Sequence, residues 1–168
     1  MGSLLAVDLG LKTGLALFND DGTLVWYRSH NFGSRERLKR GIPGLLETIP
    51  DIAAIVIEGG GNLATVWEKE AERRNIVTIR IAAEEWRHVF LYSREQRCGA
   101  DSKRHAGELA RKVIDWAQAS RPTALRHDTA EAIMIGLWGL LHLGWLQTLP
   151  KELHAKRGKK EQQGEKRK

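Results

Sequence analysis

Three short apolar runs separated by turn residues open the chain and limit its fold more than any other feature. The runs cover residues 4–7, 15–18 and 23–27, and the Asp20-Asp21-Gly22 segment before the third is typical of a tight turn. Connections this short join neighbouring antiparallel strands. The first 27 residues therefore predict a three-stranded antiparallel meander.

Strand and helix patterns alternate after this meander. The predicted elements are a helix over 35–48 (capped by Ser34, kinked or broken at 41–43), a strand over 52–57, a helix from the cap Asn62 to 74, a strand over 76–81, a helix over 83–91, a loop over 93–102, and helices over 103–119 and 128–146. Both later strands are apolar enough to be buried on both faces. This order predicts an α/β fold with a mixed five-stranded sheet flanked by helices on both faces.

Charge divides the chain into a domain and a tail. The net charge is +6, and residues 151–168 carry +5 of it, from eight Lys/Arg and three Glu. Because that segment has no apolar stripe, we predict one globular domain over residues 1–150 and a disordered basic tail over 151–168. A basic tail suits a polyanionic partner such as DNA, and a solubilising role explains it equally well.

Three features bear on the cellular compartment. Cys98 is the one cysteine, which excludes an intramolecular disulfide and suits a reducing environment. No apolar run is long enough to span a bilayer, and no signal peptide is recognisable at the start of the sequence. We expect no membrane partner and a location in the cytoplasm or nucleoid of a bacterium. An organelle reached after removal of a transit peptide is the alternative.

Four carboxylates stand at the ends of predicted elements. Asp8 ends the first strand, Glu58 ends the fourth, and Asp128 and Glu131 share one face of the last helix. Taken singly, they also fit a turn, a solvated strand end and a helix capping box. Taken together, they crowd like charge unless divalent cations neutralise it, and oxygen ligands suit Mg²⁺ or Mn²⁺ rather than zinc. We predict a metal-binding catalytic site, because two such ions about 3.5–4 Å apart support phosphodiester hydrolysis.

Three segments resemble RuvC-type Holliday junction resolvases of the RNase H-like superfamily. They are residues 4–14 (LLAVDLGLKTG), 55–58 (IVIE) and 127–132 (HDTAEA), and the element order is similar over residues 4–146. The resemblance implies an RNase H-like fold and a crossover junction endodeoxyribonuclease with two Mg²⁺ ions per site, Mn²⁺ being a substitute. It also implies a homodimer that makes paired symmetric nicks in four-way DNA junctions. Two departures are Gly59-Gly60-Gly61, where these resolvases carry a junction-probing aromatic, and Glu131, where Asp is usual.

Basic residues are the candidate DNA ligands. The resemblance implies that Lys103 helps to bind the scissile strand, where its charge would neutralise the reacting phosphate. The other candidates are Lys12, Arg35, Arg37, Lys39, Arg94, Arg97 and Arg104. Solvated helix faces explain these residues equally well. His127 is either a proton shuttle or a capping or packing residue, the latter being favoured, and Trp86-Arg87 resembles a pair in some RuvC-like proteins.

Other functions stay open from the sequence alone. The segment around Asp8 also resembles YqgF-type nucleases, which process pre-ribosomal RNA, although a glutamate directly after the fourth strand is typical of RuvC. A ribonuclease H acting on RNA–DNA hybrids is a lesser alternative. An actin-like or sugar-kinase ATPase needs two such domains and far more than 168 residues. A non-catalytic DNA-binding module is disfavoured because all four carboxylates are present.

Overall fold

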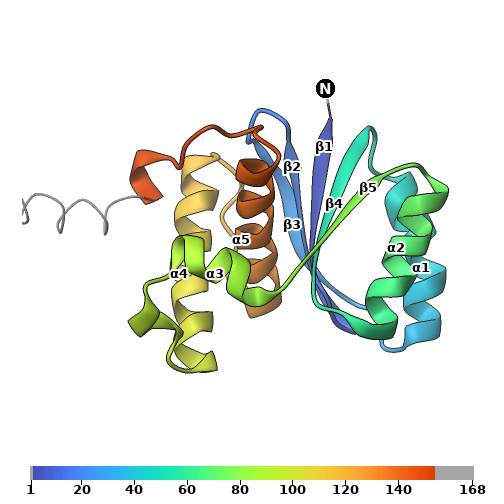
Figure 1. The fold of residues 1–168 in the computed structure, drawn as a ribbon, viewed down its shortest axis with the longest axis horizontal. Helices are drawn as coiled ribbons and strands as arrows, with labels where there is room; N and C mark the ends of the chain where they lie inside the picture. The colour runs from blue at the N-terminus through green and yellow to red at the C-terminus, as the bar shows by residue number, and fades with distance from the viewer. Residues whose placement is uncertain (1, 154–168) are drawn as a thin grey trace, which may run out of the picture.

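A computed structural model describes residues 2–153 as three layers, with a five-stranded sheet between two groups of helices (Figure 1). The strands are β1 (Ser3–Asp8), β2 (Lys12–Asn19), β3 (Leu24–Asn31), β4 (Ile52–Glu58) and β5 (Val77–Ile81). The helices are α1 (Arg35–Glu47), α2 (Gly61–Arg73), α3 (Ala83–Phe90), α4 (Gly99–Trp116) and α5 (His127–His142), with short 3₁₀ helices η1 (Ser93–Gln96) and η2 (Lys151–Leu153). The predicted α/β fold with a mixed sheet is confirmed.

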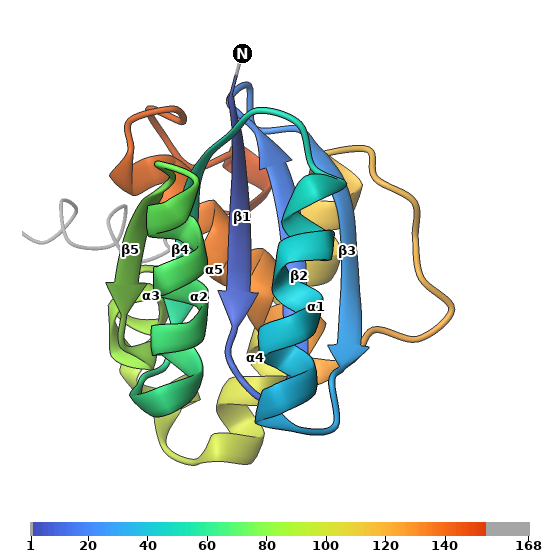
Figure 2. The ribbon, with the colours of Figure 1, turned by 90° about the vertical axis from the view of Figure 1, so that its right-hand side faces the viewer.

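The strand order, β3-β2-β1-β4-β5, places β1 at the centre of the sheet (Figure 2). The β1–β2 and β2–β3 pairs are antiparallel, as the predicted meander requires, whereas β1–β4 and β4–β5 are parallel. Parallel strands bring their carboxyl ends to the same edge of a sheet. The last residues of β1 and β4 are Asp8 and Glu58, so the topology places two carboxylates side by side.

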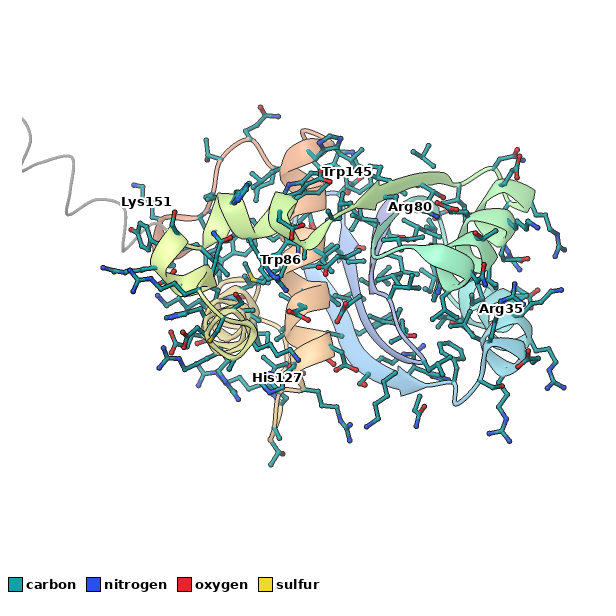
Figure 3. All side chains as sticks on the ribbon, turned by 60° about the horizontal axis from the view of Figure 1, so that its bottom comes forward. Arg35, Arg80, Trp86, His127, Trp145 and Lys151 are labelled. Atoms are coloured by element: carbon teal, nitrogen blue, oxygen red, sulfur yellow. The ribbon has the colours of Figure 1, made fainter. Side chains whose placement is uncertain are left out.

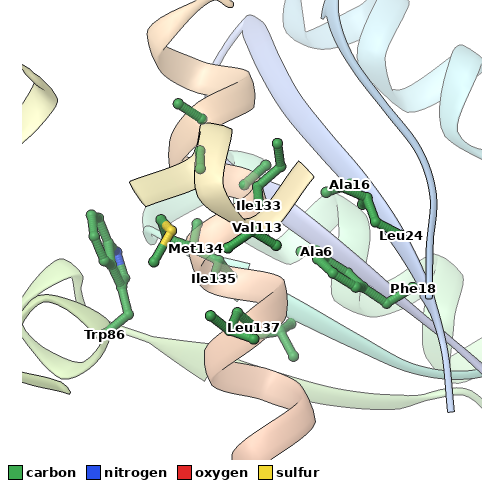
Figure 4. Packing of buried hydrophobic residues seen from close by; sticks show 14 of the residues in the cluster. Ala6, Ala16, Phe18, Leu24, Trp86, Val113, Ile133, Met134, Ile135 and Leu137 are labelled. Atoms are coloured by element: carbon green, nitrogen blue, oxygen red, sulfur yellow. The ribbon is translucent and has the colours of Figure 1, made fainter. Parts of the chain in front are cut away.

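Each face of the sheet has its own hydrophobic core because side chains alternate along β1. Leu4 and Ala6 pack toward α3, α4 and α5, and Leu5 and Val7 pack toward α1 and α2. Figure 4 shows the first of these cores, with α5 lying against the sheet. Gly136 permits that close contact, since a Cβ there would lie 2.2 Å from Cε2 of Phe18. The sheet therefore holds α5 firmly, and with it the first turn of that helix.

Two predicted helix starts are wrong because of local capping. Helix α4 begins at Gly99 rather than at residue 103. Cys98 is its N-cap, because the Sγ of Cys98 accepts a hydrogen bond from the N–H of Asp101 at 3.4 Å. Part of the predicted loop over 93–102 is therefore helical, as η1 and the first turn of α4. Helix α2 begins at Gly61 after the extended residue Gly60, so Asn62 is not its cap.

Tertiary packing explains further differences. Helix α1, capped by Ser34 as predicted, is not broken at 41–43 and contains Pro43, because Leu38, Ile42 and Leu46 bury one continuous stripe against the sheet. Strand β5 is not buried on both faces, since it lies at the sheet edge and its Val77 is 58% exposed. Strand β3 continues to residue 31 instead of 27, pairing with β2 throughout, and α5 ends at residue 142 instead of 146.

The structure describes only the first residues of the predicted tail. Residues 151–153, which we predicted to be disordered, form η2, and residues 154–168 lie outside the described part of the chain. Within residues 2–153, no helix is both long and apolar enough to cross a membrane.

Candidate active site

The structure brings all four predicted carboxylates to one place at the edge of the sheet. Asp8 and Glu58 are register partners in the parallel β1–β4 pair. Asp128 and Glu131 project from the first turns of α5, and together with Asp8 they line one surface pocket. Glu131 is 8% exposed, so its charge is largely removed from water. Arg126 is the N-cap of α5 and has no side-chain cap bond, so the capping-box interpretation of this acidic pair is wrong.

A glycine in β2 sets the distance between the sheet and Asp128. Gly14 pairs with Asp8 across the β1–β2 ladder. A Cβ on Gly14 would lie 1.9 Å from the carbonyl oxygen of Asp128, which is far inside van der Waals contact. Only a residue without a side chain lets the first turn of α5 approach the strand this closely. Gly14 is therefore part of the local architecture that holds Asp128 near Asp8.

Crowding of like charge dominates the electrostatics of Asp8. Burial, followed by the charges of Glu131 and Glu58, a hydrogen bond shared with Glu131 and the charge of Asp128, raises the pKa of Asp8 to about 8. Burial also raises the pKa of Glu58, against the lowering effect of a hydrogen bond from Trp86. Carboxyl groups this close cannot all be ionised without a compensating cation. Binding of a cation would therefore relieve the repulsion between these carboxylates.

Three side chains from other elements hold the carboxylates in place. The indole N–H of Trp86 donates to Oε2 of Glu58, and the hydroxyl of Ser29 donates to Oδ2 of Asp128. The guanidinium of Arg87 pairs with Oε1 of Glu131 at 3.2 Å. Trp86 lies on the α3 side of the sheet, facing the interior (Figure 3). Donors of this kind fix the orientation of carboxylates that bind a metal or a substrate.

The donor set fits a hard divalent cation in chemistry, although it is not a finished cage. Within residues 2–153, no three Asp, Glu, His or Cys side chains have donor atoms already placed around an ion position. The Oε2 of Glu58 and the Oε1 of Glu131 are held by Trp86 and Arg87. A carboxylate has two oxygens, so each glutamate can keep its donor and offer the other oxygen. Carboxylate oxygens are the ligands that Mg²⁺ and Mn²⁺ prefer.

Two of the predicted basic residues lie at this pocket, and the others do not. Lys12 and Lys103 line it, together with Arg126 and His127. His127 is exposed and is the first residue of α5, so its predicted capping or packing role is wrong. The remaining candidates lie elsewhere: Arg35, Arg37 and Lys39 on α1, Arg94 over the ring of Tyr92, Arg97 after η1, and Arg104 3.6 Å from Asp101. Figure 3 shows Arg35 and His127 on opposite sides of the sheet.

Sequence reasoning missed two residues of the site and the contacts of two others. Ser29 lies in the part of β3 beyond the predicted strand end, and Arg126 lies in the connection before α5. Trp86 and Arg87 stand out in the sequence as a pair, but no sequence pattern indicates that they contact Glu58 and Glu131. For Ser29 a signal did exist, since a longer strand places it opposite Gly14, next to the acidic pair on α5.

Neither protein-family models nor curated protein sequences match this chain. Comparison with solved structures gives 23 matching chains, among them the crystal structure of fowlpox virus resolvase with substrate Holliday junction DNA. That match has a TM-score of 0.63 and 14% sequence identity, and it covers 84% of this chain and 98% of the viral chain. At this identity the likeness shows the fold. The chain has the RNase H-like fold that the sequence predicted.

Proposed function

We propose that this protein is a divalent-metal-dependent endonuclease that resolves four-way DNA junctions. The observation that carries the proposal is the convergence of four carboxylates from three separate elements. Asp8, Asp128 and Glu131 line one pocket, and Glu58 lies beside Asp8 as its register partner. The likeness to fowlpox virus resolvase, whose structure holds Holliday junction DNA, supports the choice of substrate. Nucleases of the resolvase type generally use divalent metals.

The four carboxylates would hold two Mg²⁺ ions, with Mn²⁺ as a substitute. Bound there, the ions would supply Lewis acidity to activate a water and to stabilise a leaving oxygen. Lys12 and Lys103 are exposed at the pocket and would orient the scissile phosphate through its non-bridging oxygens. Water would attack phosphorus in line with the bond to the 3′ oxygen, and that bond would break. The water would lose a proton to solvent, and the leaving 3′ oxygen would take up a proton from solvent. The products therefore carry a 5′-phosphate and a 3′-hydroxyl.

Resolution of a four-way junction needs two nicks, one in each of two strands of like polarity. One chain offers one such acidic pocket among its described residues. A homodimer with twofold symmetry would supply the second site in the correct relation, because a four-way junction is itself close to twofold symmetric. The proposal therefore includes a second copy of this chain on the junction.

A cleavage assay with end-labelled substrates tests the proposal. The substrates are a four-way DNA junction, linear duplex DNA, an RNA–DNA hybrid and a structured RNA, each with Mg²⁺ or with EDTA. Asp8→Asn is the inactive variant, and Asp21→Asn, at an exposed turn, is the matched control. We expect symmetric paired cuts in the junction, made by the wild type and the control but not by Asp8→Asn.

Two other outcomes would overturn parts of the proposal. If only RNA-containing substrates are cut, the assignment of the acidic site as the active site stands, but the substrate is RNA and not a DNA junction. Junction binding without cutting, under any divalent metal, would leave a binding module with the fold of a nuclease. Cutting by Asp8→Asn at the wild-type rate would show that the active site lies elsewhere.

A further inference from the structure

A second hollow lies on the opposite face of the sheet from the acidic pocket, between the edge strand β3 and helix α1. Its walls include Arg28, His30, Phe32 and Arg37, and its α1 side is formed in part by Gly41 and Gly44. Figure 2 shows α1 beside β3 along this side of the molecule. None of the side chains that form the hollow is acidic. We call it the β3–α1 groove.

The arginines of the β3–α1 groove are not paired with carboxylates, unlike six of the fourteen arginines in the described part of the chain. Among residues 2–153, neither Arg28 nor Arg37 has a carboxylate within salt-bridge distance, whereas the arginines at 73, 74, 80, 87, 104 and 121 each have one. The guanidinium of Arg28 instead lies 4.5 Å from the ring centroid of Trp26, an arrangement that holds the charge in place without neutralising it. Two guanidinium groups without a carboxylate partner, of which Arg28 is held against Trp26, favour an anionic ligand in this hollow.

One strand pair links the groove to the proposed active site. Asn31 lines the groove and is the register partner of Lys12, which lines the acidic pocket. Alternation along β3 directs Ser29 toward Asp128 on one face and the neighbouring Arg28 toward the groove on the other. A polyanion that extends from the acidic pocket past the end of β3 would meet the groove on the other face.

We propose that the β3–α1 groove binds the phosphodiester backbone of a DNA arm that extends from the cleavage site, with Arg28 and Arg37 contacting phosphates. This inference rests on the proposed function for the identity of the polyanion. Gly44 provides a direct test, because a Cβ there meets nothing within 4 Å and the residue is exposed. A longer side chain at Gly44 can therefore enter the groove without disturbing the core.

The experiment measures binding of a fluorescently labelled four-way DNA junction, in EDTA to prevent cutting, at several salt concentrations. Gly44→Glu places a negative charge in the groove, and Gly44→Gln is its matched neutral control. We expect the Kd of Gly44→Glu to be about tenfold higher than that of Gly44→Gln, which adds nearly the same bulk to the groove without the charge. Thermal unfolding of both variants checks that the fold is intact.

The salt dependence of binding counts the phosphate contacts. Each contact contributes about 0.9 to the slope of log Kd against log salt, so Arg28→Ala/Arg37→Ala should lower the slope by about 1.8. The control double variant Arg80→Ala/Arg121→Ala removes the same charge from arginines that are already paired with Glu68 and Asp115. We expect its slope to stay near that of the wild type.

The outcomes separate this inference from the proposed function. Two results would refute DNA binding by the groove, even if the wild type cuts junctions with Mg²⁺. One is an equal Kd for Gly44→Glu and Gly44→Gln, and the other is an equal salt dependence of binding for the two double variants. Groove-dependent binding by a protein that cuts no substrate would support the groove and overturn the nuclease. A wild type that binds no DNA would overturn both.

Discussion

Replacing Asp8 by Asn is expected to stabilise the metal-free protein at neutral pH, although it removes a residue of the proposed active site. Burial and the neighbouring carboxylates raise the pKa of Asp8 to about 8, whereas in the unfolded chain it is about 3.9. Because the folded-state pKa is the higher one, ionisation of Asp8 opposes folding. This cost is absent below pH of about 4, grows between about 4 and 8, and is constant above about 8.

The magnitude follows from the same two pKa values. At pH 7 the solution lies about three pKa units above the unfolded-state value, which corresponds to roughly 4 kcal/mol. Asp8 retains some contact with water, so we expect a stabilisation of roughly 2–4 kcal/mol in Asp8→Asn. The amide of Asn carries no charge and keeps a donor for the hydrogen bond to Glu131.

Thermal and urea unfolding in EDTA, between pH of about 4 and 8, measures the effect. For a domain of this size 1 kcal/mol shifts Tm by about 2–4 °C, so Asp8→Asn should melt roughly 5–15 °C higher near pH 7.5 and nearly level with wild type near pH 4. Asp21→Asn is the control. A hydrogen bond from Thr23 lowers the pKa of Asp21, so that substitution should give a small change of opposite sign.

Adding Mg²⁺ or Mn²⁺ should offset most of the difference in stability between the two proteins. At a hundred times its Kd, a ligand stabilises the folded state by about 2.7 kcal/mol, and this gain should appear in the wild type and be nearly lost in Asp8→Asn. Equal stability of the two proteins in EDTA at every pH would refute the crowding of Asp8. Equal stabilisation of both by metal would refute its role as a ligand.

Three further substitutions test the geometry of the site. Gly14→Ala should displace the first turn of α5, lower stability by about 1–3 kcal/mol and abolish cutting. Unfolding and cleavage assays measure both effects, and the control Gly99→Ala, where a Cβ meets nothing within 4 Å, should show neither. Trp86→Phe should weaken metal affinity about 10–100-fold in a calorimetric titration, because Glu58 loses its indole donor; unchanged affinity would contradict that role. Lys103→Ala should slow single-turnover cutting about a hundredfold without changing the Tm. A wild-type rate of cutting would contradict a role of Lys103 in the reaction.

The main carboxylate pair was predictable because short-range patterns determine it. An apolar run that ends on Asp8 and another that ends on Glu58 identify two strand ends. In the antiparallel meander β2 occupies one side of β1. The crossover through α1 therefore places β4 parallel to β1 on its other side. The spacing of Asp128 and Glu131 gave their common helix face. Each of these steps needs information from only one or two elements.

The donors that hold the carboxylates were not predictable in the same way. Trp86 and Arg87 are adjacent on α3, yet one contacts Glu58 on β4 and the other contacts Glu131 on α5. Their roles depend on how α3 packs after β5, an edge strand that the sequence suggested would be buried. Packing between elements distant in sequence determines such contacts, and local sequence patterns do not predict this packing.

The charges of the acidic pocket also show why a cation and a phosphate can be bound at one place. Lys12, Lys103 and Arg126 line the pocket, yet the pKa of Asp8 is still raised to about 8. All three bases are exposed, where water screens their charge, whereas the carboxylates are drawn into the protein. Exposed bases thus do not neutralise the acids and stay free for phosphate oxygens. In the metal-free protein a proton on Asp8 and the Arg87–Glu131 ion pair compensate part of the negative charge. An ion small enough to enter between the carboxylates can replace that proton, and this is the property of a hard divalent cation.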